Sequence, residues 1–136
     1  DSLVFLNWFL ISALKESGYG IENYCCSVCG KKLKNRAFID FDSSDFFCEE
    51  HASLSSTEIR FSTYELISAL AALSPDEVKR AFLADYLNNE EGALSAYRWA
   101  SENESAKKSA LKMLDYYIEV KTGCALKTIQ QLLDVV

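Results

Sequence analysis

The chain opens with an almost unbroken apolar stretch and then returns to helical spacing over most of its length. Residues 3–14 are nearly all apolar and predict a helix from residue 2 to about residue 17. Gly18 and Gly20 end this helix, because glycine readily takes the left-handed conformation that closes a helix. Apolar side chains cover most of its circumference, so we expect it at the centre of a bundle. The run is too short to span a bilayer, and no membrane association is expected.

The pattern changes between residues 24 and 51, where cysteines, lysines and aromatic residues crowd together and alternation replaces the helical period. Residues 36–41 predict a strand, residues 42–45 a turn and residues 46–48 the returning strand. This short hairpin therefore lies between two pairs of cysteine and histidine residues.

After the second of these pairs the pattern is helical again, and we expect it to stay so. Two capping boxes start helices there, Ser62 with Glu65 and Ser74 with Glu77. In each box the hydroxyl and the carboxylate satisfy free backbone amides of the first turn. Pro75 strengthens the second box, since proline suits the first helical position. Apolar residues follow both boxes, which predicts two consecutive helices.

Three further elements are expected downstream. Residues 93–100 predict a short helix bearing Tyr97 and Trp99, for which core packing is favoured over an exposed anchor for a partner peptide. A long helix follows and ends at Gly123, and residues 126–133 form a last short helix. Apolar residues recur at three–four spacing on one face of the long helix: Ala110, Leu111, Leu114, Tyr117 and Ile118.

These elements predict a mainly α fold, a helical bundle with a small zinc-bound β-hairpin inserted after the first helix. With 136 residues the chain is long enough to bury its own core. We expect a single helical domain over residues 1–136, with the zinc-binding hairpin inserted at about residues 24–52. The first residue is Asp1 rather than methionine, which indicates a processed form or a fragment of a longer protein.

Two matched ligand pairs predict a zinc site on the hairpin. Cys26-x-x-Cys29 stands directly before Gly30, and Cys48-x-x-His51 has the same two-residue gap. This gap lets both ligands of one turn reach the same ion, and eighteen residues between the pairs leave room for the hairpin. Four protein ligands fill every position of a tetrahedral zinc. We therefore expect one closed, structural Zn²⁺ held by Cys26, Cys29, Cys48 and His51.

Other interpretations of the cysteines are less favoured. A redox-active Cys-x-x-Cys would need no second pair, and a disulfide framework suits smaller, secreted chains. Iron is possible with sulfur ligands, but the histidine favours zinc. Cys25 stands one residue too far from Cys29 and is expected to be a bystander, while Cys124 is expected to be an ordinary buried thiol.

The formal net charge of −6 argues against nucleic-acid binding over the whole surface, because such binding rests on neutralising phosphates. The densest basic cluster comprises Lys31, Lys32, Lys34 and Arg36. These residues are candidates for local phosphate contacts, and an equally favoured alternative is a solvated loop balanced by the acids Asp40, Asp42 and Asp45. A second set, Lys107, Lys108 and Lys112, is expected on the solvated outer face of the long helix.

Groups for catalysis are scarce. The single histidine is expected on the zinc, so no serine or cysteine nucleophile has a second histidine as its base. The chain contains no glycine-rich phosphate loop. Glu49 and Glu50, between the ligands of the second pair, are expected to form a solvated rim. We therefore expect neither an enzyme nor a small-molecule substrate.

The order of the motifs along the chain is itself informative. A helix ending in Gly-Tyr-Gly is followed by Cys-x-x-Cys-Gly, a hairpin, Phe-Cys-x-x-His and a helical tail. The closing stretch at residues 116–128 reads Tyr-Tyr-Ile-Glu-Val-Lys-Thr-Gly-Cys-Ala-Leu-Lys-Thr. Over nearly its whole length the chain resembles the RecO family of bacterial recombination mediators, whose closing helix, glycine and Leu-Lys-Ser-like segment are similar. The resemblance implies a structural zinc on the same four ligands.

The resemblance also implies a role in DNA repair. Members of the family anneal single strands and, with RecR, help RecA to replace single-strand-binding protein. They begin with an OB-fold domain, which this chain does not contain, so it resembles the C-terminal helical and zinc-binding part. The implied location is cytoplasmic and the implied partners are RecR and single-strand-binding protein. Single-stranded DNA would be bound through the intact protein and only weakly by this part. The alternative is a zinc-ribbon protein-interaction adaptor unrelated to RecO.

Overall fold

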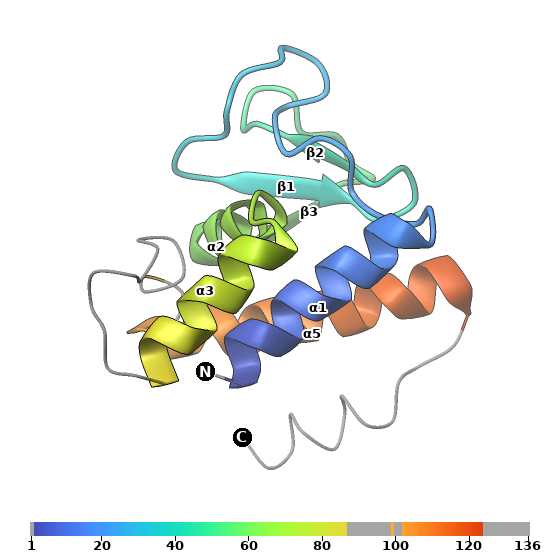
Figure 1. Cartoon of the computed structure of the whole chain (residues 1–136). Helices are drawn as coiled ribbons and strands as arrows, with labels where there is room; N and C mark the ends of the chain where they lie inside the picture. Colours follow the sequence, from blue (N-terminus) through green and yellow to red (C-terminus); the bar gives the residue numbers. More distant parts are fainter. Residues whose placement is uncertain (1, 87–98, 100–101, 124–136) are drawn as a thin grey trace.

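Along the sequence, the three strands of a small antiparallel sheet lie between the first and second helices of a mainly helical chain. The computed structural model describes residues 2–86, 99 and 102–123. Its elements, in chain order, are α1 (Ser2–Glu16), β1 (Ala37–Asp40), β2 (Asp45–Phe47), β3 (Thr57–Ile59), α2 (Phe61–Ala71), α3 (Pro75–Tyr86) and α5 (Glu104–Thr122). The helices lie together, and we call them the helical layer; the sheet with its loops lies on one side of them (Figure 1). The predicted mainly α fold with a small inserted β element is confirmed.

Helix α1 ends as its glycines indicate, but the two glycines do different things. Gly18 adopts a left-handed conformation with φ of 84° and closes the helix. Gly20 has no such conformation; a Cβ there would stand 2.7 Å from the Cα of Lys15, so it permits a close approach of the chain to α1. The expectation that α1 lies at the centre of a bundle holds only in part: α1 packs against α2 and α5, but Phe5 and Phe9 are 46% and 52% exposed.

The sheet has three strands rather than the two of the predicted hairpin. Strand β1 is central and pairs antiparallel with β2 and β3 on its two sides. The prediction that the chain becomes helical directly after His51 is wrong, since β3 was not anticipated. Its sequence signal is slight: three residues, of which Thr57 and Ile59 are β-branched. Its stability comes instead from pairing with β1.

The two predicted capping boxes have different outcomes. At the start of α3 the box is confirmed: the Glu77 amide donates to Ser74 Oγ at 3.2 Å, and the Ser74 amide donates to Glu77 Oε1 at 3.3 Å. The box at Ser62 is wrong. Helix α2 begins two residues earlier than that box would place it, after the N-cap residue Arg60, and no side chain caps it. The backbone direction there is set by β3, which ends immediately before.

Helices α1, α2 and α5 pack against one another, and the inner face of the sheet joins the same buried cluster. The predicted apolar face of α5 is confirmed, since all five of its residues are buried. The sheet contributes Ala37, Ile39 and Phe46 to this core, each with 0% exposure. Trp99 is partly buried and packs against the core, as favoured from the sequence.

The expectation that Lys107 faces solvent is wrong. Its side chain is 1% exposed, because position 107 lies on the same face of α5 as Ala110 and Leu114. The aliphatic stem is buried, and Nζ reaches out to Glu104 Oε1 at 2.6 Å. Lys112 is exposed, as expected. The predictions for Tyr97, Cys124 and the helix at 126–133 lie outside the described residues, and the division into domains stays a prediction.

Candidate metal centre

Four side chains meet at one end of the sheet. The ligand atoms of Cys26, Cys29, Cys48 and His51 all lie within 4.8 Å of one another. Cys26 Sγ is 3.7 Å from His51 Nδ1, and Cys29 Sγ is 4.0 Å from Cys48 Sγ. Ligands in a tetrahedron around zinc, with Zn–S near 2.3 Å, stand about 3.8 Å apart. A third pair, Cys48 Sγ and His51 Nδ1, is closer at 3.0 Å. The residues present therefore fit a single ion with four protein ligands.

The first ligand pair lies on a tight turn that its own backbone closes. The Gly30 amide donates to the Cys26 carbonyl at 2.9 Å, and the Cys26 amide donates to the Lys31 carbonyl at 2.9 Å. Gly30 has φ of 73°, a conformation that other residues rarely adopt. This is why a glycine directly follows Cys29: the turn that brings two sulfurs together needs a left-handed residue.

The turn is fastened to the sheet and to the helices. The Ser27 amide donates to the Phe46 carbonyl at 2.9 Å, so the turn continues the sheet beside β2. The Tyr64 hydroxyl, on α2, donates to the Tyr24 carbonyl at 2.7 Å. Cys26 itself is fully buried within the core. The first half of the site is therefore held by tertiary contacts as well as by its own turn.

The local field favours a thiolate at Cys26. Burial raises the pKa of this thiol, but hydrogen bonds from the backbone of Cys29, Cys48 and Val28 outweigh burial and lower the pKa to about 6. Burial and the neighbouring Cys26 sulfur raise the pKa of Cys48. Two adjacent thiols cannot both ionise cheaply without a cation between them, so the cluster is suited to a metal ion.

Cys25 does not join the cluster, which comprises Cys26 and three other residues. Its backbone pairs with Lys32 across the turn, and its amide donates to Asn23 Oδ1 at 3.0 Å. The next residue along the strand-like segment points to the opposite side, which brings Cys26 to the other ligands. The ligand spacing in the sequence indicated the same choice.

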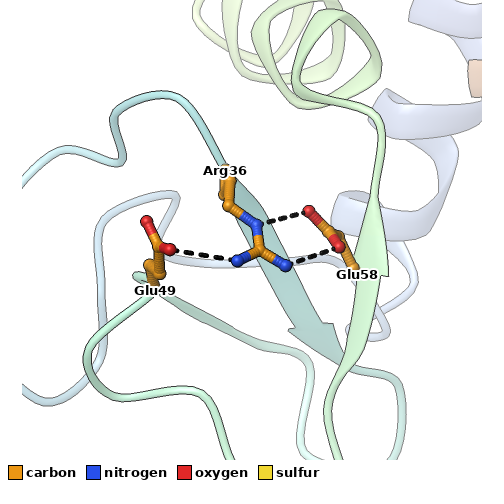
Figure 2. A network of polar contacts seen from close by, with 3 residues as sticks. All are labelled: Arg36, Glu49 and Glu58. Atoms are coloured by element: carbon orange, nitrogen blue, oxygen red, sulfur yellow. Dashed lines mark hydrogen bonds and ion pairs between the residues drawn. The ribbon is translucent and has the colours of Figure 1, made fainter.

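The basic cluster divides into two parts in the structure. Lys31, Lys32 and Lys34 are exposed on the loop between the first ligand pair and β1. Arg36 is engaged by two carboxylates, those of Glu49 and Glu58 (Figure 2). These hydrogen bonds raise the pKa of Arg36, and the same contact lowers the pKa of Glu58. The sequence did not indicate Glu58 as a partner, because it lies on the unanticipated strand β3.

The structure thus shows a mainly helical fold with a Cys₃His cluster that could hold a metal ion. Comparison with known families gives a closer assignment: the family model described as "Recombination protein O C terminal" matches residues 1–129. The chain belongs to this RecO C-terminal family. Searches of curated proteins and of solved structures return no match. The family acts in DNA recombination and repair and is a mediator family rather than a known class of enzyme. An adaptor unrelated to RecO is thereby excluded.

In residues 2–86, 99 and 102–123, no helix has both the length and the apolar character required to cross a membrane.

Proposed function

We propose that this chain is the part of a RecO-type recombination mediator that carries one structural zinc and contacts partner proteins. The family match over residues 1–129 is the observation that carries this proposal. The mediator, together with RecR, helps RecA to replace single-strand-binding protein on single-stranded DNA. Zinc is the ion of choice, because three cysteines and one histidine form a typical structural zinc set and leave no open position for catalysis.

Bound zinc would be held by Cys26, Cys29, Cys48 and His51 and would supply cross-linking rather than reactivity. The buried Cys26 anchors the ion to the core, and His51 closes the second turn through its amide, which donates to the Cys48 carbonyl at 3.1 Å. The zinc content of the purified protein tests this. One zinc per chain is expected, and a chain that purifies without zinc and does not take it up would contradict the proposal.

Direct DNA contact is proposed for the exposed lysines only. Lys31, Lys32 and Lys34 lie on one loop at the end of the sheet, whereas the chain as a whole has a net charge of −6. Fluorescence anisotropy with labelled oligothymidine over a salt series measures the contribution. We expect weak binding, and a triple lysine-to-glutamine variant should reduce the salt slope by up to about 0.7 for each phosphate that is no longer neutralised.

The exposed pair Lys79 and Arg80 on α3 offers a control, because neutralising them removes two positive charges away from this loop, against three on the loop. Equal losses per charge removed in the two variants would show that only net charge matters. Binding in the nanomolar range at physiological salt would overturn the division in which the intact protein supplies most DNA affinity.

The partner assignments are tested with purified RecR and purified single-strand-binding protein by titration calorimetry. We expect this chain to bind at least one of them. Failure with both, for zinc-loaded protein of confirmed fold, would remove the protein-contact role from this part of the mediator.

A further inference from the structure

Arg36 sits at the centre of a three-residue polar network on the outer side of the sheet (Figure 2). Its Nε and Nη2 donate to the two carboxylate oxygens of Glu58 at 2.8 and 2.9 Å. Its Nη1 donates to Glu49 Oε1 at 3.0 Å. The guanidinium carbon also lies 5.1 Å from the ring centroid of Phe38. The guanidinium is therefore held by a forked pair, a second carboxylate and an aromatic face.

The two carboxylates come from different parts of the chain. Glu49 lies between the ligands Cys48 and His51, two residues after the end of β2. Glu58 is on β3 and lies opposite Phe38 in the sheet register. Arg36 immediately precedes β1 and thus joins the second ligand pair to the far edge of the sheet.

The second ligand pair, Cys48 and His51, needs a contact that fixes its orientation. Cys48 is positioned by β2, but His51 lies three residues beyond Cys48 on an irregular segment. Within the pair, the His51 amide donates to the Cys48 carbonyl at 3.1 Å. That bond fixes the turn internally without fixing its orientation toward Cys26 and Cys29.

We propose that Arg36 is a positioning residue for the metal centre, which orients the turn bearing His51 by holding Glu49 against Glu58. This inference rests on the proposed zinc site. It assigns Arg36 a role different from phosphate contact, since three of its five N–H donors are already used by the two carboxylates.

The test is the rate of zinc release to a chelator in excess, followed with a zinc indicator at neutral pH. Arg36→Ala and Glu49→Gln should each accelerate release roughly three- to tenfold. Removing a residue that hydrogen-bonds a metal ligand typically costs about 10- to 100-fold in metal affinity. We expect an effect at or below the low end of that range, because Arg36 contacts the neighbour of a ligand and the contact is half-exposed. Arg36→Lys should restore the rate only in part, since an ammonium cannot form the forked contact.

The double variant Arg36→Ala/Glu49→Gln should release zinc no faster than the quicker single variant, because both changes act on the same contact: Glu49→Gln weakens it to a neutral hydrogen bond and Arg36→Ala removes it. Arg60→Ala is the matched control. Arg60 is an exposed arginine between β3 and α2. Its Nη1 donates to Ser105 Oγ, on α5, at 2.7 Å. Its loss should leave the release rate within about twofold of the parent protein, since its bond joins elements away from the ligands.

Three outcomes would overturn the inference. Release rates equal to the parent protein in Arg36→Ala would show that the network does not position the ligands. Equal acceleration in Arg60→Ala would show a general loss of stability, and weakened DNA binding with unchanged zinc release would show a phosphate contact. If the parent protein itself holds no zinc, the proposed function fails first, and the two failures are thus distinguishable.

Discussion

The helical layer and the sheet with its candidate metal centre are stabilised by different interactions. In the helical layer, long elements bury apolar faces against one another: α5 alone has 19 residues and eight buried side chains. In the sheet, the strands have four, three and three residues. Strands this short and few do not stand alone in water. We therefore expect the helical layer to depend less on the sheet than the sheet depends on its two attachments, the core that it shares with the helices and the proposed zinc at its end.

The largest expected effect comes from removing the metal. Structural zinc contributes about 10–16 kcal/mol of apparent binding free energy in small peptides, comparable to the stability of a whole domain. Zinc removal or Cys48→Ser should leave most helical circular dichroism in place and abolish hydrogen-exchange protection in β1. Zinc per chain should fall below one.

Cys25→Ser is the control for that experiment, because Cys25 lies outside the ligand cluster. It should keep one zinc and full protection of β1. If Cys48→Ser also kept one zinc, the ligand set would be wrong. If the helical signal collapsed together with the sheet, the two regions would be one cooperative unit.

A smaller effect is expected where the two regions meet. The Tyr117 hydroxyl, on α5, lies 2.8 Å from Ser44 Oγ in the turn between β1 and β2, and it also donates to the Tyr19 carbonyl. Tyr117→Phe should cost about 1–2 kcal/mol of unfolding free energy, because it removes two part-buried hydrogen bonds at once. Urea denaturation measures this loss.

The contrast with Tyr116→Phe sharpens that measurement. Tyr116 is 53% exposed and packs its ring edge-on against Phe41, an arrangement that phenylalanine preserves. The free energy of unfolding of Tyr116→Phe should be within about 0.5 kcal/mol of that of the parent protein. Equal losses in both variants would mean that the Tyr117 hydroxyl does not link the two regions.

The two serines that resemble helix caps offer a third, still smaller comparison within the helical layer. Ser74→Ala should destabilise the protein by about 1 kcal/mol, because it removes a hydroxyl that accepts from the Glu77 amide. Ser62→Ala should be neutral or slightly stabilising, since Ser62 lies inside the first turn of α2 and caps nothing. Thermal unfolding resolves the difference, and the reverse order would contradict the observed start of α2.

The smallest effect concerns pH. The hydrogen bond from Lys107 lowers the pKa of Glu104 below its usual range. A lowered carboxylate pKa contributes stability that is present above the unfolded pKa of about 4.3 and is lost as pH falls through the folded value. Glu104→Gln should therefore lower the melting temperature by about 1–3 °C at pH 7, and the gap should close toward pH 3.

Both proteins lose metal alike in acid, so only the difference between them is informative. A gap that widened in acid would show that the Glu104 carboxylate is not stabilised by Lys107.

What could be predicted from the sequence follows the same division. Helical periodicity is a local signal, and it located α1, α3 and the buried face of α5. The ligand spacing is also local, and it favours Cys26 over Cys25, the same cysteine that the cluster contains. Strand β3 could not be found in this way, because three residues have little intrinsic preference and the strand exists through its pairing with β1, about twenty positions earlier.

The missed contacts depend on that strand. Glu58 lies 22 residues from Arg36, so the network around Arg36 is invisible before the sheet is known. The start of α2 was misplaced for a related reason: the Thr63 amide donates to the Arg60 carbonyl, directly at the end of β3. Lysine is usually exposed, so the sequence places Lys107 outward, whereas the structure buries its whole side chain and pairs its amine with the Glu104 carboxylate.

The strand order β2-β1-β3 has a consequence for handling the protein. The longest strand, which carries Phe38 and Ile39, is covered on both sides, and the outer strand β3 has only three residues with the charged Glu58 at its centre. Short, charged outer strands discourage edge-to-edge association between molecules. Once the metal is lost and the outer strands detach, an apolar edge is uncovered. Metal-free preparations should therefore precipitate on storage, and a chelator in the purification buffer is best avoided.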